Sequence, residues 1–315
     1  MIANHHSTLL ADDIERLKRE RNAVILAHNY QPGPVQDLAD FVGDSLAMAR
    51  WAAQSSADVV VVAGVYFMAE TAAILCPDKT VIIPDPKAGC SLAESITADQ
   101  LQAWKNNFPE AVVVSYVNTS AAVKALSDYC CTSSNAVKVV EQIDPEREIL
   151  FLPDFFLGSH VARMTGRQNI RVWMGECHVH AGIDAETLTK TVESHPGAEV
   201  LVHPECGCTT RALALPPQGI ATQVLSTDGM ISHSRKSPSQ SFIIATEIGL
   251  LHRLRQESPH KQFIAASEHA LCPFMNLINL ENIRDGLRDL AHVVSVPEAV
   301  REKALLPLKR MVAIG

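Results

Sequence analysis

The sequence contains no run of about 20 apolar residues, so it offers no candidate for a membrane-spanning helix. Its first 30 residues lack the basic segment and apolar core of a secretory signal peptide. Positive charge is also scarce, because 27 Lys and Arg residues face 35 Asp and Glu residues and leave a net charge of -8. This balance argues against nucleic acid or an anionic membrane as the main partner. We therefore expect a cytoplasmic protein.

The eight cysteines include no CxxC pair, which excludes a four-cysteine zinc ribbon and a thioredoxin-type redox motif. Structural disulfides are not expected in a reducing cytoplasm. A free cysteine is commonly no more than a small buried hydrophobic residue. Any functional role for these cysteines must therefore come from a pattern in their positions.

The chain carries an internal threefold repeat. Three apolar, strand-like runs end in polar residues, and the landmarks His28, Tyr116 and His203 lie 88 and 87 residues apart. After each run come a helix-like segment, a turn with a hydroxyl residue, a second apolar strand, more helix-like sequence and a last strand. The three starting runs are residues 23–30, 111–120 and 198–205. Each repeat therefore alternates strands with helices.

Strands rich in Val, Ile and Leu that alternate with helices are typical of a parallel sheet covered on both faces. Crossovers in such sheets are right-handed, so the carboxyl ends of the strands share one edge, where ligands bind. We therefore predict an α/β fold of three pseudo-threefold-related αβα units. Each has a small, mainly parallel sheet, and the units converge on a central active site. The predicted units are residues 1–104 with an N-terminal helix, 105–190, and 191–315 with C-terminal helices.

One cysteine occupies the same point of each unit. Cys90, Cys177 and Cys272 each follow the last strand, 87 and 95 residues apart, whereas the other five cysteines share no threefold pattern. Three converging thiolates suit an iron–sulfur cluster that keeps one iron open as a Lewis acid. Zinc held by three cysteines and one histidine stays an alternative. The candidates for that histidine are His178, His180 and His269.

Polar residues at the strand ends describe a cavity suited to proton transfer. His, Tyr and Glu side chains move protons when a site tunes them, although a single one at a strand end can equally cap a backbone group. Hydroxyl residues that precede helix-like segments can serve as N-caps or can hold a carboxylate or phosphate. The strand-end residues are His28, Tyr30, Tyr116, Asn118, His203 and Glu205, and the hydroxyl residues are Ser45, Ser133, Ser226 and Thr227.

Seven segments stand out between roughly residues 20 and 300: "AHNYQPGPVQDLADFVGDSLAMAR", "MAETAAIL", "PDPKAGCSLAES", "SYVNTSAAVKALSDYCCTSSNAVKVV", "WMGECHVHAG", "LVHPE" and "CPFMN". Together they resemble the quinolinate synthase family, the iron–sulfur enzymes of de novo NAD biosynthesis.

The resemblance implies a three-domain fold and a [4Fe-4S] cluster held by Cys90, Cys177 and Cys272. It implies that iminoaspartate and dihydroxyacetone phosphate condense to quinolinate with loss of phosphate and water, with an aspartate-oxidising enzyme as the source of iminoaspartate. Proton transfer is expected from Tyr30, Tyr116, His203 and Glu205. The histidines beside Cys177 are expected to orient the metal ligands or to be structural. The residues expected to bind substrate are His28, Ser45, Tyr116, Asn118, Ser133, His203, Glu205, Ser226 and Thr227.

The chain departs from the family pattern in two places. Some members carry a CxxCxxC run that ends at the third ligand, but here the first two of those positions are Ala266 and His269. An insert at 206–219 lengthens the third unit, and no role follows for Cys206 or Cys208. Two other functions stay open: a zinc-dependent lyase or hydrolase with the same three cysteines, and a non-catalytic iron–sulfur sensor. No basic helix-turn-helix pattern supports the sensor.

Overall fold

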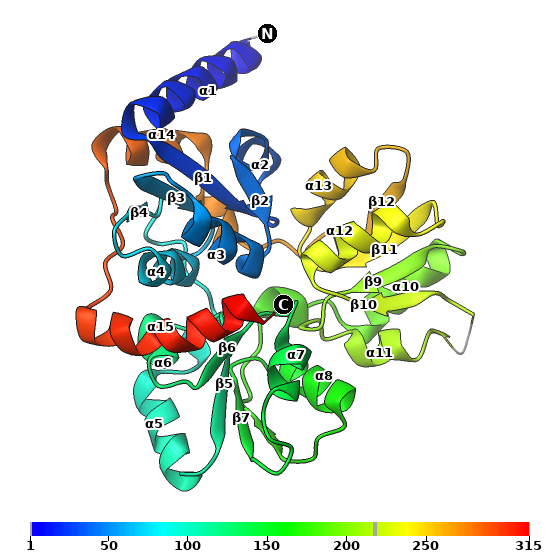
Figure 1. Cartoon of the computed structure of the whole chain (residues 1–315). Coiled ribbons are helices and arrows are strands. Elements are labelled where there is room, and N and C mark those ends of the chain that lie inside the picture. The colour runs from blue at the N-terminus through cyan, green and yellow to red at the C-terminus, as the bar shows by residue number, and fades with distance from the viewer. Residues whose placement is uncertain (1, 217–218, 315) are drawn as a thin grey trace.

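Three four-stranded parallel sheets form the framework of the part of the chain that the computed structural model describes, residues 2–216 and 219–314 (Figure 1). In each sheet the second strand of the unit comes first, followed by the first, third and fourth. The strands of the first sheet are β1 (Ala23–His28), β2 (Phe41–Gly43), β3 (Val59–Ala63) and β4 (Thr80–Ile82). Those of the second are β5 (Val112–Tyr116), β6 (Tyr129–Cys131), β7 (Ile149–Leu152) and β8 (Ile170–Val172). Those of the third are β9 (Glu199–Val202), β10 (Thr222–Val224), β11 (Ser241–Ala245) and β12 (Gln262–Ala265).

The shared strand order confirms the predicted α/β fold of three related units. Every strand pair within the sheets is parallel. The central strands are buried along all or nearly all of their length, as the Val59–Ala63 run shows. Burial on both faces explains why these strands are continuous apolar runs instead of alternating ones. The division of the chain at residues 104 and 190 stays a prediction.

Helices connect the strands and cover the sheets. The first unit has α1 (Ile2–Arg21), α2 (Gly33–Leu38), α3 (Ser45–Gln54), α4 (Tyr66–Leu75) and the 3₁₀ turn η1 (Ala93–Ser95). Next come α5 (Ala98–Asn107), α6 (Ala121–Lys124), α7 (Ala136–Glu141), α8 (Phe155–Thr165), α9 (His178–Ala181) and α10 (Ala185–Ser194). Then follow α11 (Thr209–Leu213), α12 (Thr227–Lys236), α13 (Leu250–Glu257), η3 (Met275–Leu277), α14 (Leu280–Asp289) and α15 (Glu298–Ala313). Among the helices described, none has the length and apolar character needed to cross a membrane.

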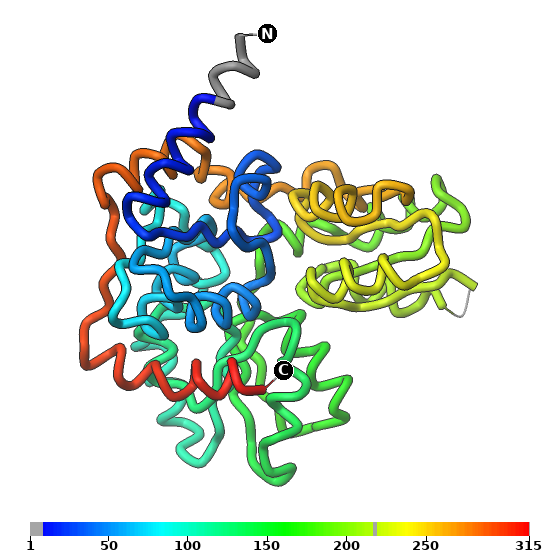
Figure 2. Tube along the Cα trace, turned by 45° about the horizontal axis from the view of Figure 1, so that its top comes forward, coloured from blue at the N-terminus to red at the C-terminus, as the bar shows by residue number. Residues whose placement is uncertain are grey.

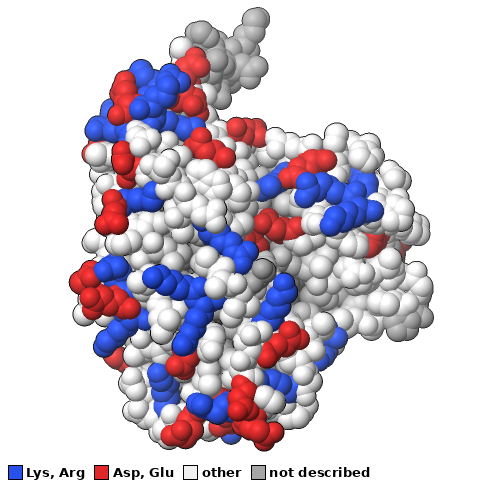
Figure 3. All heavy atoms as spheres, viewed as in Figure 1, with Lys and Arg blue, Asp and Glu red and all other residues white. Residues whose placement is uncertain are grey.

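Side-chain caps and surface ion pairs occur on several of these helices. Thr97 and Gln100 form a reciprocal capping box at the start of α5. On α1, acidic and basic side chains intermingle (Figure 3), and Arg16 pairs with Glu20 at 2.7 Å. Exposed pairs of this kind stabilise a helix only slightly, so the fold depends on its buried core. The largest core cluster draws residues from all three units.

The C-terminal helices leave the third sheet and pack against the first two units (Figure 2). Helix α14 lies on α1 and β3, and α15 lies on β6, α6 and α4. The end of α15 is tied down on both sides. Asn135 donates to the carbonyl oxygens of Met311 at 2.9 Å and Ile314 at 2.5 Å. Arg50 donates to the carbonyl oxygen of Val312 at 3.0 and 2.8 Å.

We predict that Asn135→Ala lowers the free energy of unfolding by about 1–3 kcal/mol, because it leaves the carbonyl groups of Met311 and Ile314 without the amide donor. Chemical denaturation measures the change. The matched control is Asn106→Ala, whose side chain makes only an exposed hydrogen bond with Gln102 and should change stability by less than ~0.5 kcal/mol. Equal effects of the two substitutions would contradict this role for Asn135.

Candidate functional site

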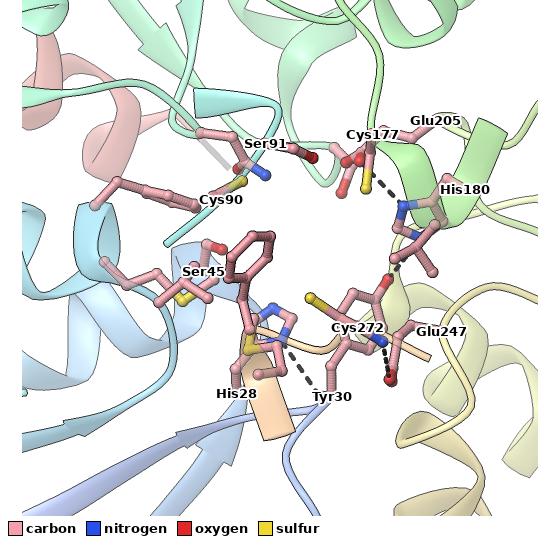
Figure 4. Close-up of a pocket in the computed structure, with 18 of the residues that line it drawn as sticks. His28, Tyr30, Ser45, Cys90, Ser91, Cys177, His180, Glu205, Glu247 and Cys272 are labelled. Carbon is pink, nitrogen blue, oxygen red and sulfur yellow. Dashed lines mark hydrogen bonds and ion pairs between the residues drawn. The ribbon is translucent and has the colours of Figure 1, made fainter. Parts of the chain in front are cut away.

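The carboxyl ends of the three sheets open on one shared pocket of about 700 Å³, a volume that includes space open to solvent (Figure 4). All the site residues expected from the sequence line it except Ser226. The first unit contributes His28, Tyr30, Ser45 and Cys90, the second Tyr116, Asn118, Ser133 and Cys177, and the third His203, Glu205, Thr227 and Cys272. Because right-handed crossovers place all strand ends of a parallel sheet on one edge, each unit delivers its polar residues to the same side.

The three cysteines of the repeat reach the pocket from equivalent loops, each just after the last strand of its unit. All three are free and half-buried, whereas the other five cysteines are buried. Burial raises the pKa of Cys90 and of Cys272, and the nearby Cys177 raises both further. A bound cation would reverse this effect, since a metal deprotonates a coordinating thiol. The three side chains are therefore chemically able to hold a metal centre, which would keep them as thiolates.

A second set of possible ligands overlaps this one. Ligand atoms of Cys177, His180 and Glu205 all lie within 4.8 Å of one another. Only Cys177 belongs to both sets. Two thiol loops from the other units face the same pocket, and the Cys177–His180–Glu205 group does not use them. Of the histidines considered as zinc ligands, His178 and His180 line the pocket, whereas His269 is exposed and lies elsewhere.

Glu205 is the centre of a buried polar network. Tyr116 donates a short hydrogen bond to its Oε1, and its Oε2 lies 3.3 Å from Nδ1 of His180. The rings of His180 and His203 stack with their centroids 4.8 Å apart. Burial alone would raise the pKa of Glu205, but His180, His203 and the Tyr116 hydrogen bond together lower it below its usual range. Glu205 is therefore a carboxylate at neutral pH.

The two strand-end histidines are neutral. Burial is the main reason that the pKa of His28 and that of His203 each fall to about 3. Nδ1 of His28 accepts a hydrogen bond from the Tyr30 backbone N–H at 3.2 Å. This contact places the ring proton on Nε2. His203 Nε2 and the Ser133 hydroxyl lie 3.1 Å apart, so this pair links the second and third units.

His180 is the main residue whose importance the sequence analysis missed. It is buried, and its Nε2 lies 3.2 Å from the Tyr30 hydroxyl and 2.9 Å from the Thr246 hydroxyl. Burial lowers the pKa of His180, but Tyr30, Cys177 and Glu205 outweigh burial and raise it well above the usual value. The available signal was its spacing, three residues after a cysteine at the start of a short helix. Asp44, Phe67, Glu247 and Phe274 also line the pocket and were not expected from the sequence.

The hydroxyl residues divide into one helix cap and three pocket residues. Only Ser226 is a true N-cap, since its hydroxyl accepts from Gly229 N at 3.2 Å. The N-cap interpretation is wrong for the other three. Asp44, the residue before Ser45, caps α3. Ser133 lies two residues before the N-cap of α7 and contacts His203, and Thr227 is the first residue of α12 and accepts from Asn29 at 2.9 Å.

Comparison with known proteins places the whole chain in one family. The family model described as Quinolinate synthetase A protein matches residues 12–313. A quinolinate synthase from Thermus thermophilus is 53% identical over 306 residues, covering 97% of this chain and 97% of the relative. One from Pyrobaculum aerophilum is 51% identical, covering 96% and 99%. One from Mycobacterium tuberculosis is 52% identical, covering 97% and 88%. Together with the Cys177–His180–Glu205 group, these matches indicate a metal cofactor.

The capping difference predicts different stabilities. Ser226→Ala removes an N-cap and should lower the free energy of unfolding by ~1 kcal/mol. Ser45→Ala is the matched control, because Asp44 keeps capping its helix, and it should change stability by less than ~0.5 kcal/mol. Thermal and chemical denaturation of both variants provide the measurement. A larger loss in Ser45→Ala than in Ser226→Ala would refute this assignment of the hydroxyls.

Proposed function

The chain belongs to the quinolinate synthetase A family and is an enzyme of quinolinate synthesis, and we propose that it condenses iminoaspartate with dihydroxyacetone phosphate, losing phosphate and water. The observation that carries this proposal is the single pocket in which three cysteines and three sets of strand-end polar residues meet. A condensation of two small anionic molecules needs groups that hold anions, groups that move protons and a Lewis acid that helps a hydroxyl leave. The pocket offers residues of all three kinds.

Cys90, Cys177 and Cys272 would hold the metal centre, which we propose to be a [4Fe-4S] cluster. With three protein ligands, one iron would stay open and would supply Lewis-acid assistance to the loss of a substrate hydroxyl. The support is the chemistry of the donor set, since each unit brings one thiol to the pocket from an equivalent loop. The histidines beside Cys177 would then orient ligands and substrate. His178 already contacts Ser91 of the first unit at 2.6 Å.

Proton transfer falls to the network around Glu205. Its neighbours keep it ionised at neutral pH, so it is available as the proton acceptor of this network. Burial raises the pKa of Tyr116, and the neighbouring Glu205 raises it further. Tyr116 is therefore a neutral donor. Tyr30 is a second neutral donor, because burial raises the pKa of its hydroxyl. His203, held neutral beside Glu205, can pass a proton between its two ring nitrogens.

The hydroxyls that do not cap a helix match the substrates' anionic groups in number. Ser45, Ser133 and Thr227 come from the three different units and line the same pocket. The two substrates carry two carboxylates and one phosphate, so one hydroxyl for each anionic group is a chemical match. Asn118 and the Nε2–H of His28 would add neutral donors. Ser226 is left out of this set, because it caps α12 and does not line the pocket.

A zinc-dependent lyase or hydrolase is the second candidate, and the Cys177–His180–Glu205 group favours it. Three protein ligands and one open position are the usual arrangement of a catalytic zinc ion. That site would need neither Cys90 nor Cys272. It also would not explain why the repeat brings one thiol from each unit to the pocket, so we prefer the cluster.

Iminoaspartate is an imine, and water hydrolyses imines. We propose that an aspartate-oxidising enzyme forms it close to its point of use in the cytoplasm. The non-catalytic sensor is the weakest candidate. In the described part of the chain, all three repeats direct their polar residues into one pocket and not onto a surface that a partner could bind.

Substituting the cysteines tests the function directly. Cys90→Ser, Cys177→Ser and Cys272→Ser should each abolish broad absorption near 400 nm (roughly), which thiolate-to-iron charge transfer produces, and should stop quinolinate formation from the two substrates. Anaerobic spectra and product analysis measure both. Cys131→Ala and Cys208→Ala are the controls and should keep the spectrum and the activity. If Cys90→Ser and Cys272→Ser kept metal and activity while Cys177→Ser lost them, the zinc site would be correct instead.

The hydroxyl set predicts a pattern of binding. Ser45→Ala, Ser133→Ala and Thr227→Ala should each weaken quinolinate binding by ~1.5–3 kcal/mol, because each removes a hydrogen bond to a charged group. Ser226→Ala should leave the affinity unchanged. Calorimetry on the anaerobic protein measures the affinities. Unchanged affinity in the three pocket variants would remove these residues from the binding site.

A further inference from the structure

A short segment at the carboxyl end of β11, residues 246–249, touches two functional elements of the site without belonging to either. Thr246 and Glu247 are each only 1% exposed. Neither was expected from the sequence, and the mechanism above gives neither a role. Their side chains make contacts with different groups. Each meets a different part of the site.

The Thr246 hydroxyl completes a triangle with two side chains from the other units. It lies 2.6 Å from the hydroxyl of Tyr30 in the first unit and 2.9 Å from Nε2 of His180 in the second. Tyr30 and His180 are themselves 3.2 Å apart. A threonine hydroxyl both donates and accepts, so Thr246 can bridge the two groups. All three side chains are buried, which strengthens such hydrogen bonds and makes their loss costly.

The Glu247 carboxylate holds the loop that carries the third cysteine (Figure 4). Its Oε1 accepts from the backbone N–H of Cys272 at 3.0 Å. Its Oε2 accepts from the backbone N–H of Gly249 at 2.6 Å. A hydrogen bond to the N–H of a ligand residue limits where that residue's sulfur can lie. The carboxylate therefore ties the Cys272 loop to the end of β11.

Gly249 connects this segment to Tyr30 a second time. A Cβ atom at this position would lie 2.6 Å from the Tyr30 carbonyl oxygen and 2.8 Å from Glu247 Oε2. Only glycine, which has no Cβ atom, lets these two segments of the backbone approach this closely. Gln36 reinforces the contact, since its Nε2 donates to the carbonyl oxygens of Gly249 at 3.0 Å and Gln31 at 2.7 Å. The backbone around Tyr30 is therefore packed directly against residues 246–249.

We propose that Thr246 and Glu247 are positioning residues, Thr246 for the Tyr30 hydroxyl and Glu247 for the Cys272 loop. This inference rests on the proposed function, because the two residues would act through Tyr30 as a proton donor and Cys272 as a cluster ligand. Residues 246–249 then fix the position of Tyr30 in the first unit relative to Cys272 in the third unit. Partners that orient metal ligands typically change metal affinity or activity about 10- to 100-fold when they are lost.

The test for Thr246 compares two substitutions. Thr246→Val keeps the shape but removes the hydroxyl, and should lower kcat about 10- to 100-fold, the usual cost of a misplaced catalytic group. The KM values and the iron content should stay unchanged. Thr246→Ser restores a hydroxyl and should recover most of kcat. A Thr246→Val enzyme with normal kcat, or one that Thr246→Ser does not rescue, would overturn the role of Thr246.

The test for Glu247 measures how firmly iron is held. Glu247→Gln keeps one acceptor oxygen but turns an amide toward one of the two N–H groups, so iron should leave to a chelator about 10-fold faster than from the wild type. The matched control is Glu199→Gln, which alters another buried carboxylate of the third unit, paired with His233 and Ser237. Its iron should leave at the wild-type rate. Equal rates for Glu247→Gln and Glu199→Gln would overturn the role of Glu247.

The wild-type protein separates this inference from its premise. If the anaerobic wild type holds no iron and forms no quinolinate, the proposed function fails and this inference fails with it. If the wild type does both and the Thr246 and Glu247 variants match it, the inference alone is wrong.

Discussion

Parallel strands end at a common edge, and every part of the site depends on that constraint. Each unit places polar residues after its first strand, a hydroxyl after its second and a cysteine after its fourth. One such edge could not enclose a pocket by itself. Three edges facing one another produce a buried cavity whose walls come from distant parts of the chain. C-terminal helices α14 and α15 then hold the first two units around it.

Burial gives the pocket its chemistry. It keeps His28 and His203 neutral and keeps the tyrosine hydroxyls protonated. Glu205 escapes the same effect because His180, His203 and Tyr116 stabilise its charge. A charged base therefore lies among neutral donors, which is the separation that acid–base catalysis at neutral pH requires. The cysteines differ from Glu205, since burial and their mutual proximity favour the neutral thiols unless a bound metal balances the charge of the thiolates.

Much of this arrangement could be predicted from the sequence, because repeat spacing and parallel-strand topology are local rules applied three times. They identified the fold, the three cysteines and many of the polar residues that line the pocket, but not Asp44, Phe67, Glu247 or Phe274. They named His180 only as a possible zinc ligand or supporting histidine and could not place it in the network, since its role arises from neighbours 25 and 66 residues away, Glu205 and Thr246. They left open whether Ser45, Ser133 and Thr227 are caps or pocket residues, because the cap position differs from its neighbour by only one or two residues. Thr246 and Glu247 carry no motif at all, and only contacts between the units reveal them.

We propose that the threefold cysteines form one metal centre. The decisive measurement is the iron and acid-labile sulfide content per chain of protein purified without oxygen. We expect about four of each per chain, as a cubane cluster requires, and their loss when any one of Cys90, Cys177 and Cys272 is replaced. One zinc ion per chain without sulfide, retained after Cys90 and Cys272 are both replaced, would contradict it.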